Sequence, residues 1–330
     1  MRELYFTQAI AEALREAMEE DERVIVLGED VVTGPIGGTK GLFDRFGPTR
    51  VRNTPITEQT IVGSCVGAAA TGLRPVADLM FASFMYLAMD QLGNQAARLR
   101  YMSGGQIELP IVFLTGAGPA GGLAAQHSEN PHPLLMHLSG LRVVVPSTPG
   151  DAKALMLASV RDPNPVAYMI DLVLAGQKGP VDEAGELELG QADVKREGSD
   201  VTVVAIGSLV RLALQVAEEL EEQGISVEVV DPRSLVPLDW DVIGASIKKT
   251  GALVVADPAR RTCGAAAEIL SRAVEENWDD LRVQPRRVTW ADVPIPFSPP
   301  LEEAVTVTAG DLRDAVLAAA RAQQGASSWT

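Results

Sequence analysis

Short apolar runs alternate with amphipathic segments along most of this chain. In the first half, five runs rich in apolar and β-branched residues have the length of strands, at 23–27, 75–79, 110–115, 141–145 and 165–169. Helical periodicity lies between them, most clearly at 84–101 and 151–161. Continuous apolar strands that alternate with helices predict a parallel sheet buried on both faces.

A second series of the same kind follows a segment, 172–199, that has no periodicity and is rich in Gly, Pro, Asp and Glu. Strands are predicted at 201–206, 226–230, 252–256 and 287–290, and helices at 209–223, 240–249 and 265–277. Gly224 stands where a left-handed residue would end its helix. The pattern predicts two three-layer α/β/α domains, at 1–180 and 200–322, with a linker at 181–199 and a disordered tail at 323–330.

Composition and charge narrow the class of protein. The 330 residues are 46% apolar and 22% charged, as in soluble globular proteins. The chain opens with an amphipathic helical pattern rather than a signal peptide, and no apolar run is long enough to span a bilayer, so we expect a cytoplasmic protein that does not bind membranes. A net charge of −16 argues against nucleic-acid binding. Eleven acidic residues between 182 and 222 form either a solvated surface or a docking surface for a basic partner.

The cysteines and histidines exclude some chemistry. Cys65 and Cys263 are far apart in the chain, and we expect buried free thiols rather than a disulfide. All three histidines, His127, His132 and His137, fall within eleven residues after the Gly-rich stretch 116–122. Positions five apart are rotated by about 140° on a helix, which is not the spacing of zinc ligands. Proton handling is therefore a better hypothesis than metal binding.

Glu58 is the acid with the most suggestive setting. It stands at the start of the apolar, small-residue segment 61–72, and between residues 59 and 89 the only charged residues are Arg74 and Asp78. The small side chains would let another helix approach closely, which suggests burial at a subunit contact. A desolvated carboxyl group there would be suited to hold or share a proton near neutral pH.

A structural interpretation of Glu58 stands beside this one. Thr54 or Thr57 would cap the helix, Pro55 would occupy its first position, and Glu58 would face the positive end of the helix dipole. The residues alone leave both interpretations open.

Several ordered motifs identify a family. They are GEDV at 28–31, TPITE at 54–58, GLRPV at 72–76, DQ at 90–91 with NQAA at 94–97, RYMSGGQ at 100–106, AQHS at 125–128, VPSTP at 145–149 and VPIPFSP at 293–299. Over nearly its whole length the chain resembles the β subunit of the thiamine-diphosphate-dependent first component of 2-oxo acid dehydrogenase complexes, which act on pyruvate, acetoin or branched-chain 2-oxo acids. The resemblance implies a transketolase-like pyrimidine-binding domain followed by a transketolase C-terminal-like domain.

The resemblance also implies roles for particular residues. Glu58 would hydrogen-bond the pyrimidine ring of the cofactor and promote the tautomer that deprotonates the thiazolium carbon. Phe84 would stack on the pyrimidine, and Ile56 and Met80 would be its apolar contacts. His127 would exchange protons with the substrate or with the acyl-carrying intermediate. His137 would be structural or line the channel, and His132 would either shape the substrate entrance or lie in a surface loop.

An ion site and partners follow from the same resemblance. Relatives hold a structural potassium ion, for which the matching residues here are Ile111, Ser159, Val160, Asp162 and Asn164. The chain lacks the Gly-Asp-Gly and Asn-Asn signature for the cofactor's diphosphate and Mg²⁺. An α subunit would therefore supply that half, in an α₂β₂ heterotetramer. A lipoyl-bearing acyltransferase would dock on the second domain and receive the acyl group.

Two segments depart from the family pattern, at 171–176 and 257–261. They keep a different reaction class open, that of a carboligase or transketolase-like enzyme acting outside a dehydrogenase complex. A third hypothesis is a non-catalytic subunit that only completes the fold of its partner.

Overall fold

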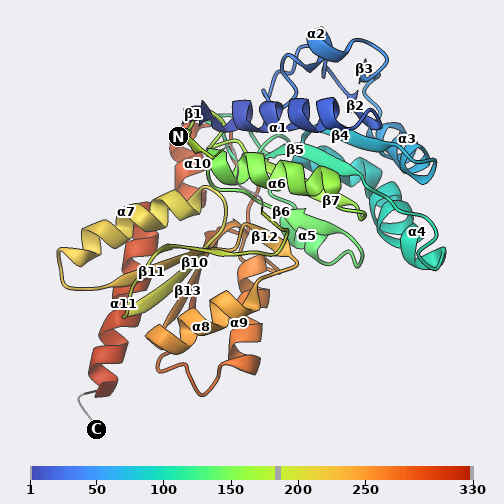
Figure 1. Ribbon diagram of the computed structural model, residues 1–330. Coiled ribbons are helices and arrows are strands. Elements are labelled where there is room, and N and C mark those ends of the chain that lie inside the picture. Colours follow the sequence, from blue (N-terminus) through green and yellow to red (C-terminus); the bar gives the residue numbers. More distant parts are fainter. Residues whose placement is uncertain (1, 183–186, 328–330) are drawn as a thin grey trace. The chain divides into compact units, whose positions relative to one another are not determined.

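The structure, a computed structural model, describes residues 2–182 and 187–327, the last four of them by backbone alone. The described residues form two compact units, one containing most of the chain up to Leu189 and the other most of the chain from Gly190 (Figure 1). Two short segments do not follow this division of the sequence, because each belongs to the other unit. Gly121–Ala125 belongs to the second unit, and Leu235–Pro237 belongs to the first.

The first unit is built on a seven-stranded sheet of order β12-β6-β7-β5-β4-β2-β3. The pairs from β6 through to β3 are parallel. In that order the strands are β12 (Ser234–Val236), β6 (Arg142–Val144), β7 (Val166–Asp171), β5 (Val112–Ala117), β4 (Arg74–Phe81), β2 (Val24–Gly28) and β3 (Val51–Asn53). A separate antiparallel pair joins β1 (Arg2–Tyr5) to β8 (Lys178–Val181).

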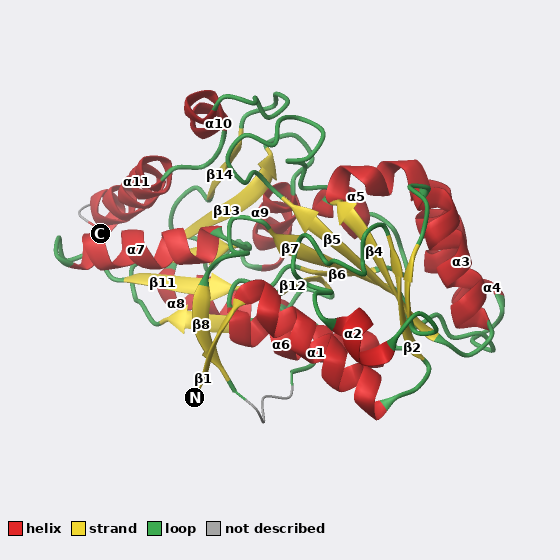
Figure 2. Cartoon of the chain, turned by 90° about the horizontal axis from the view of Figure 1, so that it is seen from above, coloured by secondary structure: helices red, strands yellow, loops and turns green. Residues whose placement is uncertain are grey.

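Helices cover both faces of this sheet. They are α1 (Phe6–Glu20), α2 (Leu42–Phe46), α3 (Glu58–Ala70), the 3₁₀ segment η1 (Ala82–Ala88), the π segment η2 (Gln91–Ala96), α4 (Ala97–Met102), α5 (His132–Met136) and α6 (Pro149–Arg161). Helices α1 and α6 lie on one side of the strands and α3 on the other (Figure 2). The unit therefore has three layers, as the alternating pattern predicts.

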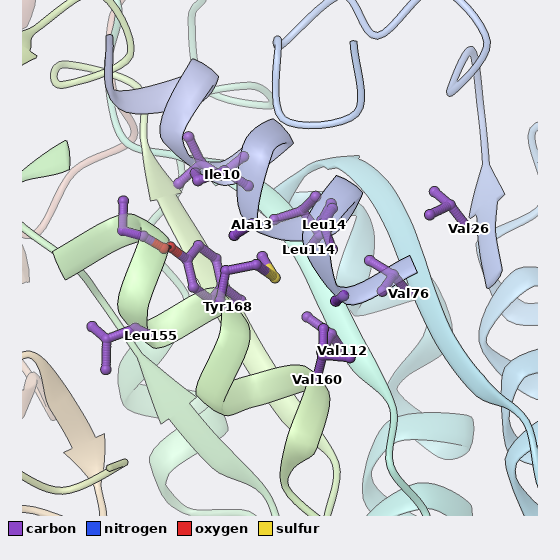
Figure 3. Close-up of a cluster of buried hydrophobic side chains, with 14 of the residues drawn as sticks. Ile10, Ala13, Leu14, Val26, Val76, Val112, Leu114, Leu155, Val160 and Tyr168 are labelled. Atoms are coloured by element: carbon purple, nitrogen blue, oxygen red, sulfur yellow. The ribbon is translucent and has the colours of Figure 1, made fainter. Parts of the chain in front are cut away.

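The core under α1 and α6 shows why these segments form the elements they do. Ile10, Ala13 and Leu14 recur on one face of α1 and are fully buried against Val112, Leu114 and other strand residues (Figure 3). Tyr168 is also fully buried, and its hydroxyl donates a 2.6 Å hydrogen bond to a backbone carbonyl of α6. Burial of the aromatic ring with a satisfied hydroxyl ties β7 to α6.

The second unit contains a five-stranded sheet of order β14-β13-β10-β11-β9, in which only β9 is antiparallel. Its strands are β9 (Asp193–Arg196), β10 (Val201–Ala205), β11 (Val227–Asp231), β13 (Leu253–Arg260) and β14 (Arg286–Trp290). Its helices are α7 (Leu209–Glu221), α8 (Trp240–Thr250), α9 (Ala265–Glu276), α10 (Pro299–Val305) and α11 (Ala309–Ser327). The core between this sheet and helices α7 and α11 is built from Val, Leu and Ala side chains, and α8 and α9 contact the strands outside that core.

Every strand predicted from the apolar runs is present, with ends shifted by no more than a few residues. Gly224 has φ of +77°, as expected for the residue that ends α7. The single helix predicted at 84–101 is wrong, because this segment is divided into η1, η2 and α4. Segments η1 and η2 both pack against α3, and we attribute the departure from a uniform α-helix to this contact.

The segments between and after the predicted domains also differ from expectation. The predicted linker at 181–199 contains β9, a strand of the second sheet, while residues 183–186 lie outside the described residues. Over 323–327 the predicted disordered tail is helical, because α11 continues to Ser327, and residues 328–330 are not described. In the described part of the chain, no helix combines the length and apolarity that a membrane span requires.

Candidate active site

Glu58 is the first residue of α3, and its side chain is buried, with 7% exposure. Thr57 occupies the N-cap position but makes no side-chain capping bond, and the buried Thr54 hydroxyl has no partner among the described residues. Pro55 lies outside the helix. Capping by either threonine, with Pro55 as first helical residue, is therefore wrong, although Glu58 does lie at the positive end of the helix.

The Glu58 carboxyl group has no hydrogen bond or ion pair within the described part of the chain. The charge of Glu58 affects the pKa of a nearby acid, Glu29. Burial is the main cause that raises the pKa of Glu29, and the charges of Asp30 and Glu58 add to it. The side chain of Glu58 is largely buried, yet neither of its carboxyl oxygens is both enclosed and unpartnered, so the carboxyl end stays accessible. Glu58 thus presents a free, accessible acceptor that a ligand or partner from outside this chain can reach.

The end of β4 carries two of the predicted cofactor residues. Met80 is 9% exposed and has φ of +60°, a left-handed conformation that is uncommon for a residue with a side chain. The β4–β5 register shifts between Asp78 and Phe81, so the strand is irregular at this point. Phe84 follows in η1, which packs against α3, the helix that begins with Glu58. The elements that carry these residues are therefore neighbours.

Three rings form a cluster beside this irregular strand end. The ring of His127 is 4.5 Å from that of Phe81 and 5.4 Å from that of Phe84, in edge-to-face arrangements. The Ser83 hydroxyl donates to the backbone carbonyl of Gln126, which fixes the loop next to His127. His127 itself is half-buried. The structure thus brings the predicted catalytic histidine and the predicted stacking phenylalanine into contact.

Ile56 is 69% exposed, which is unusual for a large apolar side chain. It lies two residues before Glu58, on the segment between β3 and α3. An exposed isoleucine beside a buried, unpaired acid is consistent with an apolar ligand or partner contact at this position. The small-residue face of α3 is likewise partly exposed at Ser64, Gly67 and Ala70.

The other histidines and the cysteines correct some expectations. His132 is 1% exposed at the start of α5, so a surface-loop position is wrong for it, and His137 is exposed at the end of α5. Cys65 and Cys263 are both free thiols, as predicted, but Cys263 is exposed rather than buried. Within the described residues, no group of three or more His, Cys, Asp or Glu side chains could hold a metal ion.

The predicted potassium residues also lie together, because the Leu109 N–H bonds to the Pro163 carbonyl and brings the segment before β5 against the loop before β7. Several of their oxygen atoms already accept internal donors. The Val160 carbonyl accepts from Arg74 at 2.8 Å and the Asn164 side-chain oxygen from Arg100 at 2.6 Å. A carbonyl oxygen has two lone pairs, so the set can still contribute ligands to a monovalent cation.

Asp78 and Glu29 are residues of this site that the sequence patterns did not single out. Asp78 lies within β4, is 7% exposed, and accepts a 3.0 Å hydrogen bond from the Met80 N–H. Burial first, with a smaller contribution from the charge of Glu29, raises the pKa of Asp78 to about 6. An acid inside an otherwise apolar strand was the available signal for Asp78.

Two family models match the two halves of the chain. The model described as transketolase, pyrimidine binding domain, matches residues 2–171, and the model described as transketolase, C-terminal domain, matches residues 190–312. Both matches agree with the two units of the structure. The family match and the fold thus point to the same two-domain organisation.

Curated relatives cover most of the chain. The acetoin:2,6-dichlorophenolindophenol oxidoreductase subunit beta of Bacillus subtilis (strain 168) is 43% identical over 317 residues, which is 92% of this chain and 93% of the relative. The pyruvate dehydrogenase E1 component subunit beta of Rickettsia felis is 42% identical over 314 residues, which is 93% of this chain and 96% of the relative. These relatives differ in the substrate that their names give.

Solved structures show the same fold. A split-gene transketolase, solved as an inactive β₄ tetramer, is similar with a TM-score of 0.80 at 29% identity, over 97% of this chain and 99% of that one. The transketolase of Campylobacter jejuni has a TM-score of 0.72 at 16% identity and covers 96% of this chain but 47% of the other. The second likeness concerns the fold alone.

Proposed function

Because this chain belongs to the transketolase-like family that includes the β subunits of acetoin:2,6-dichlorophenolindophenol oxidoreductase and of the pyruvate dehydrogenase E1 component, we propose that it is the β subunit of a thiamine-diphosphate-dependent dehydrogenase that acts on a 2-oxo acid or acetoin. The observation that carries the proposal is the Glu58 side chain, which is largely buried but presents an accessible carboxyl group that has no hydrogen-bonding partner within the described residues. It stands at the start of α3, and the motif at 54–58 that contains it resembles the one that carries the acid in the family.

The residues around Glu58 suit the pyrimidine half of thiamine diphosphate. An aminopyrimidine has ring nitrogens that a carboxyl group can hydrogen-bond, and apolar faces that a phenyl ring and aliphatic side chains can cover. Phe84, Met80 and the exposed Ile56 supply such surfaces on neighbouring elements. When bound, the cofactor would supply a carbon nucleophile. Glu58 would hold the proton on the pyrimidine, and the apolar residues would exclude water.

His127 is the group best placed for proton transfer with the substrate. It is half-buried, and the edges of Phe81 and Phe84 hold its ring on two sides. Such packing restricts the imidazole to few orientations, as general acid–base catalysis requires. We assign it the role of proton donor or acceptor at the substrate oxygen.

The chain would bind only part of the cofactor, so we propose an α subunit that binds the diphosphate and Mg²⁺, in an α₂β₂ heterotetramer. The exposed small-residue face of α3 supports a close subunit contact. We further propose that a lipoyl-bearing acyltransferase docks on the second unit and accepts the acyl group, and that Ile111, Ser159, Val160, Asp162 and Asn164 hold a potassium ion. A melting temperature that rises in K⁺ relative to equal Na⁺ would support the ion site, and equal melting temperatures would oppose it.

The experiment is dye reduction by a purified α–β pair. With thiamine diphosphate and Mg²⁺, we expect 2,6-dichlorophenolindophenol to be reduced with pyruvate, acetoin or a branched-chain 2-oxo acid, and the preferred substrate identifies the complex. The Glu58→Gln variant should assemble with α but lose turnover. Absence of turnover with all these substrates would refute the proposal.

The same assay separates the alternatives. A carboligase acting outside a complex would form carbon–carbon bonds and bind no lipoyl acyltransferase, and the relatives named above favour the dehydrogenase over it. A non-catalytic subunit would tolerate Glu58→Gln with activity of the assembled pair unchanged.

A further inference from the structure

Asp78 is a buried acid that the mechanism above does not use. Its carboxylate oxygen Oδ1 lies 3.0 Å from the backbone nitrogen of Met80, two residues further along β4, and accepts its N–H. Met80 is the residue with left-handed backbone geometry, and the register with β5 shifts at the same place. An aspartate that bonds the N–H two residues ahead closes a local turn in the backbone.

The Met80 turn needs such a bond. A residue with a Cβ atom is strained in the left-handed region, and such strain persists only where the surroundings hold it. The Met80 N–H is buried and would lack an acceptor if the Asp78 oxygen were removed. The neighbouring strand β2 pairs with β4 here and packs tightly against it, since a Cβ atom added at Gly28 would lie 2.1 Å from the Asp78 carbonyl oxygen. The backbone of Asp78 is therefore held by its pairing with β2, while its side chain accepts the Met80 N–H.

Residues of the site depend on this turn. Met80 is itself a predicted cofactor contact, and the next residue, Phe81, has its ring 4.5 Å from the ring of His127. Phe81 also contacts Phe84 at 6.0 Å between ring centroids. A change of the backbone at Met80 would redirect Phe81 and remove one of the two rings that pack against His127.

We propose that Asp78 is a positioning residue of the active site, whose carboxylate holds the left-handed turn at Met80 and through it sets the places of Met80, Phe81 and His127. This proposal rests on the proposed function and adds to it a residue that touches neither cofactor nor substrate. It concerns hydrogen-bond acceptance, so an amide oxygen at position 78 would serve nearly as well as a carboxylate.

Two variants distinguish a role of Asp78 as hydrogen-bond acceptor from a role in which its side chain only fills space. Asp78→Asn keeps an oxygen acceptor in the same place, and Asp78→Val keeps similar bulk without one. In the assembled α–β complex, we expect Asp78→Val to weaken thiamine diphosphate binding and to lower kcat, each on the order of 10–100-fold, as misplaced groups do. Asp78→Asn should stay within about threefold of the wild type in both, because the turn is retained.

A matched control exists in the second unit. The buried Asp231 likewise accepts the N–H of the residue two positions on, Arg233, at 2.9 Å, and Arg233 also has left-handed geometry, with φ of +57°. Asp231→Val should lower the melting temperature as Asp78→Val does, but leave cofactor affinity and kcat unchanged. Equal loss of cofactor affinity in both valine variants would overturn a specific positioning role for Asp78.

A readout without turnover keeps this proposal distinct from the proposed function. In methyl-labelled full-length chain, the Met80 methyl and His127 ring resonances should shift in Asp78→Val and remain near their wild-type positions in Asp78→Asn. Unshifted resonances in the valine variant would overturn the proposal even if the enzyme is active. Shifted resonances in the valine variant, together with a wild-type complex that turns over no substrate, would leave positioning intact and refute only the assigned reaction. An asparagine variant as impaired as the valine variant would show that charge, not acceptance, is needed.

Discussion

Replacement of the buried Asp78 by Asn should change how the stability of the chain depends on pH. Burial, helped by the charge of Glu29, raises the pKa of Asp78 to about 6, above its ordinary value of 3.8, while the Met80 N–H bond opposes the rise. A carboxyl group with a raised folded-state pKa favours folding below its unfolded pKa. That contribution is lost as pH rises through the folded pKa. The contribution of Asp78 to the free energy of unfolding of the wild type therefore falls between about pH 4 and pH 7. The Asp78→Asn variant has no titrating group at this position and lacks this fall.

The magnitude follows from the shift. A rise of the pKa from 3.8 to about 6 corresponds to a total change of about 3 kcal/mol in the free energy of unfolding. About half of it, roughly 1.4 kcal/mol, is lost between pH 5 and pH 8, because the unfolded group is already mostly ionised at pH 5. For a unit of this size, that difference corresponds to about 3–5 °C in melting temperature.

The assay compares melting temperatures of the wild type and Asp78→Asn by circular dichroism at pH 5 and pH 8, at low protein concentration. The difference, variant minus wild type, should be about 3–5 °C larger at pH 8. Any constant effect of the amide cancels in this comparison, so the sign is decisive. A difference that is equal at both pH values, or larger at pH 5, would refute the reasoning that Asp78 is ionised at a cost in the folded chain.

Three further substitutions test other parts of the structure. Glu58→Gln should reduce kcat of the α–β complex on the order of 10²–10⁴-fold with assembly intact, as measured by dye reduction and sedimentation. Lys153→Met should destabilise the chain by about 2 kcal/mol in thermal unfolding, because the buried Lys153 ammonium loses a 2.8 Å charged hydrogen bond to Glu12, which keeps Arg2 as its other partner; an unchanged melting temperature would contradict this. Tyr168→Phe should cost about 1 kcal/mol through its lost hydroxyl bond, whereas Tyr101→Phe, at a site 90% exposed, should cost nothing measurable, and equal effects would contradict the assignment.

Much of the fold could be predicted from hydrophobic patterning. Strands β2, β4, β5, β7, β10, β11 and β13 are buried along almost all of their length, so each appears in the sequence as a continuous apolar run. Helices α6 and α7 have the period of a surface helix with one buried face. Short strands such as β1 and β3, and helix α11, were not predicted, because brief or weakly periodic segments leave little signal.

The active site could be predicted only in part. Glu58, Phe84 and His127 were identified through motifs that resemble those of a known family, and the structure places the rings of Phe84 and His127 in contact. Their cofactor and catalytic roles remain predictions. Periodicity could not reveal the division of 84–101 into η1, η2 and α4, because it depends on contact with α3. The burial of His132 likewise depends on residues distant in sequence.

The sequence by itself determined which segments are buried, because burial needs apolar residues at the spacing of a strand or helix, and that spacing is local. Only the tertiary structure decided the environment of single polar groups. Asp78 acquires a raised pKa, and Met80 a left-handed turn, because β4 is enclosed by neighbouring strands and helices. Desolvation and charge interactions act through space between residues far apart in the chain, so no local pattern encodes them.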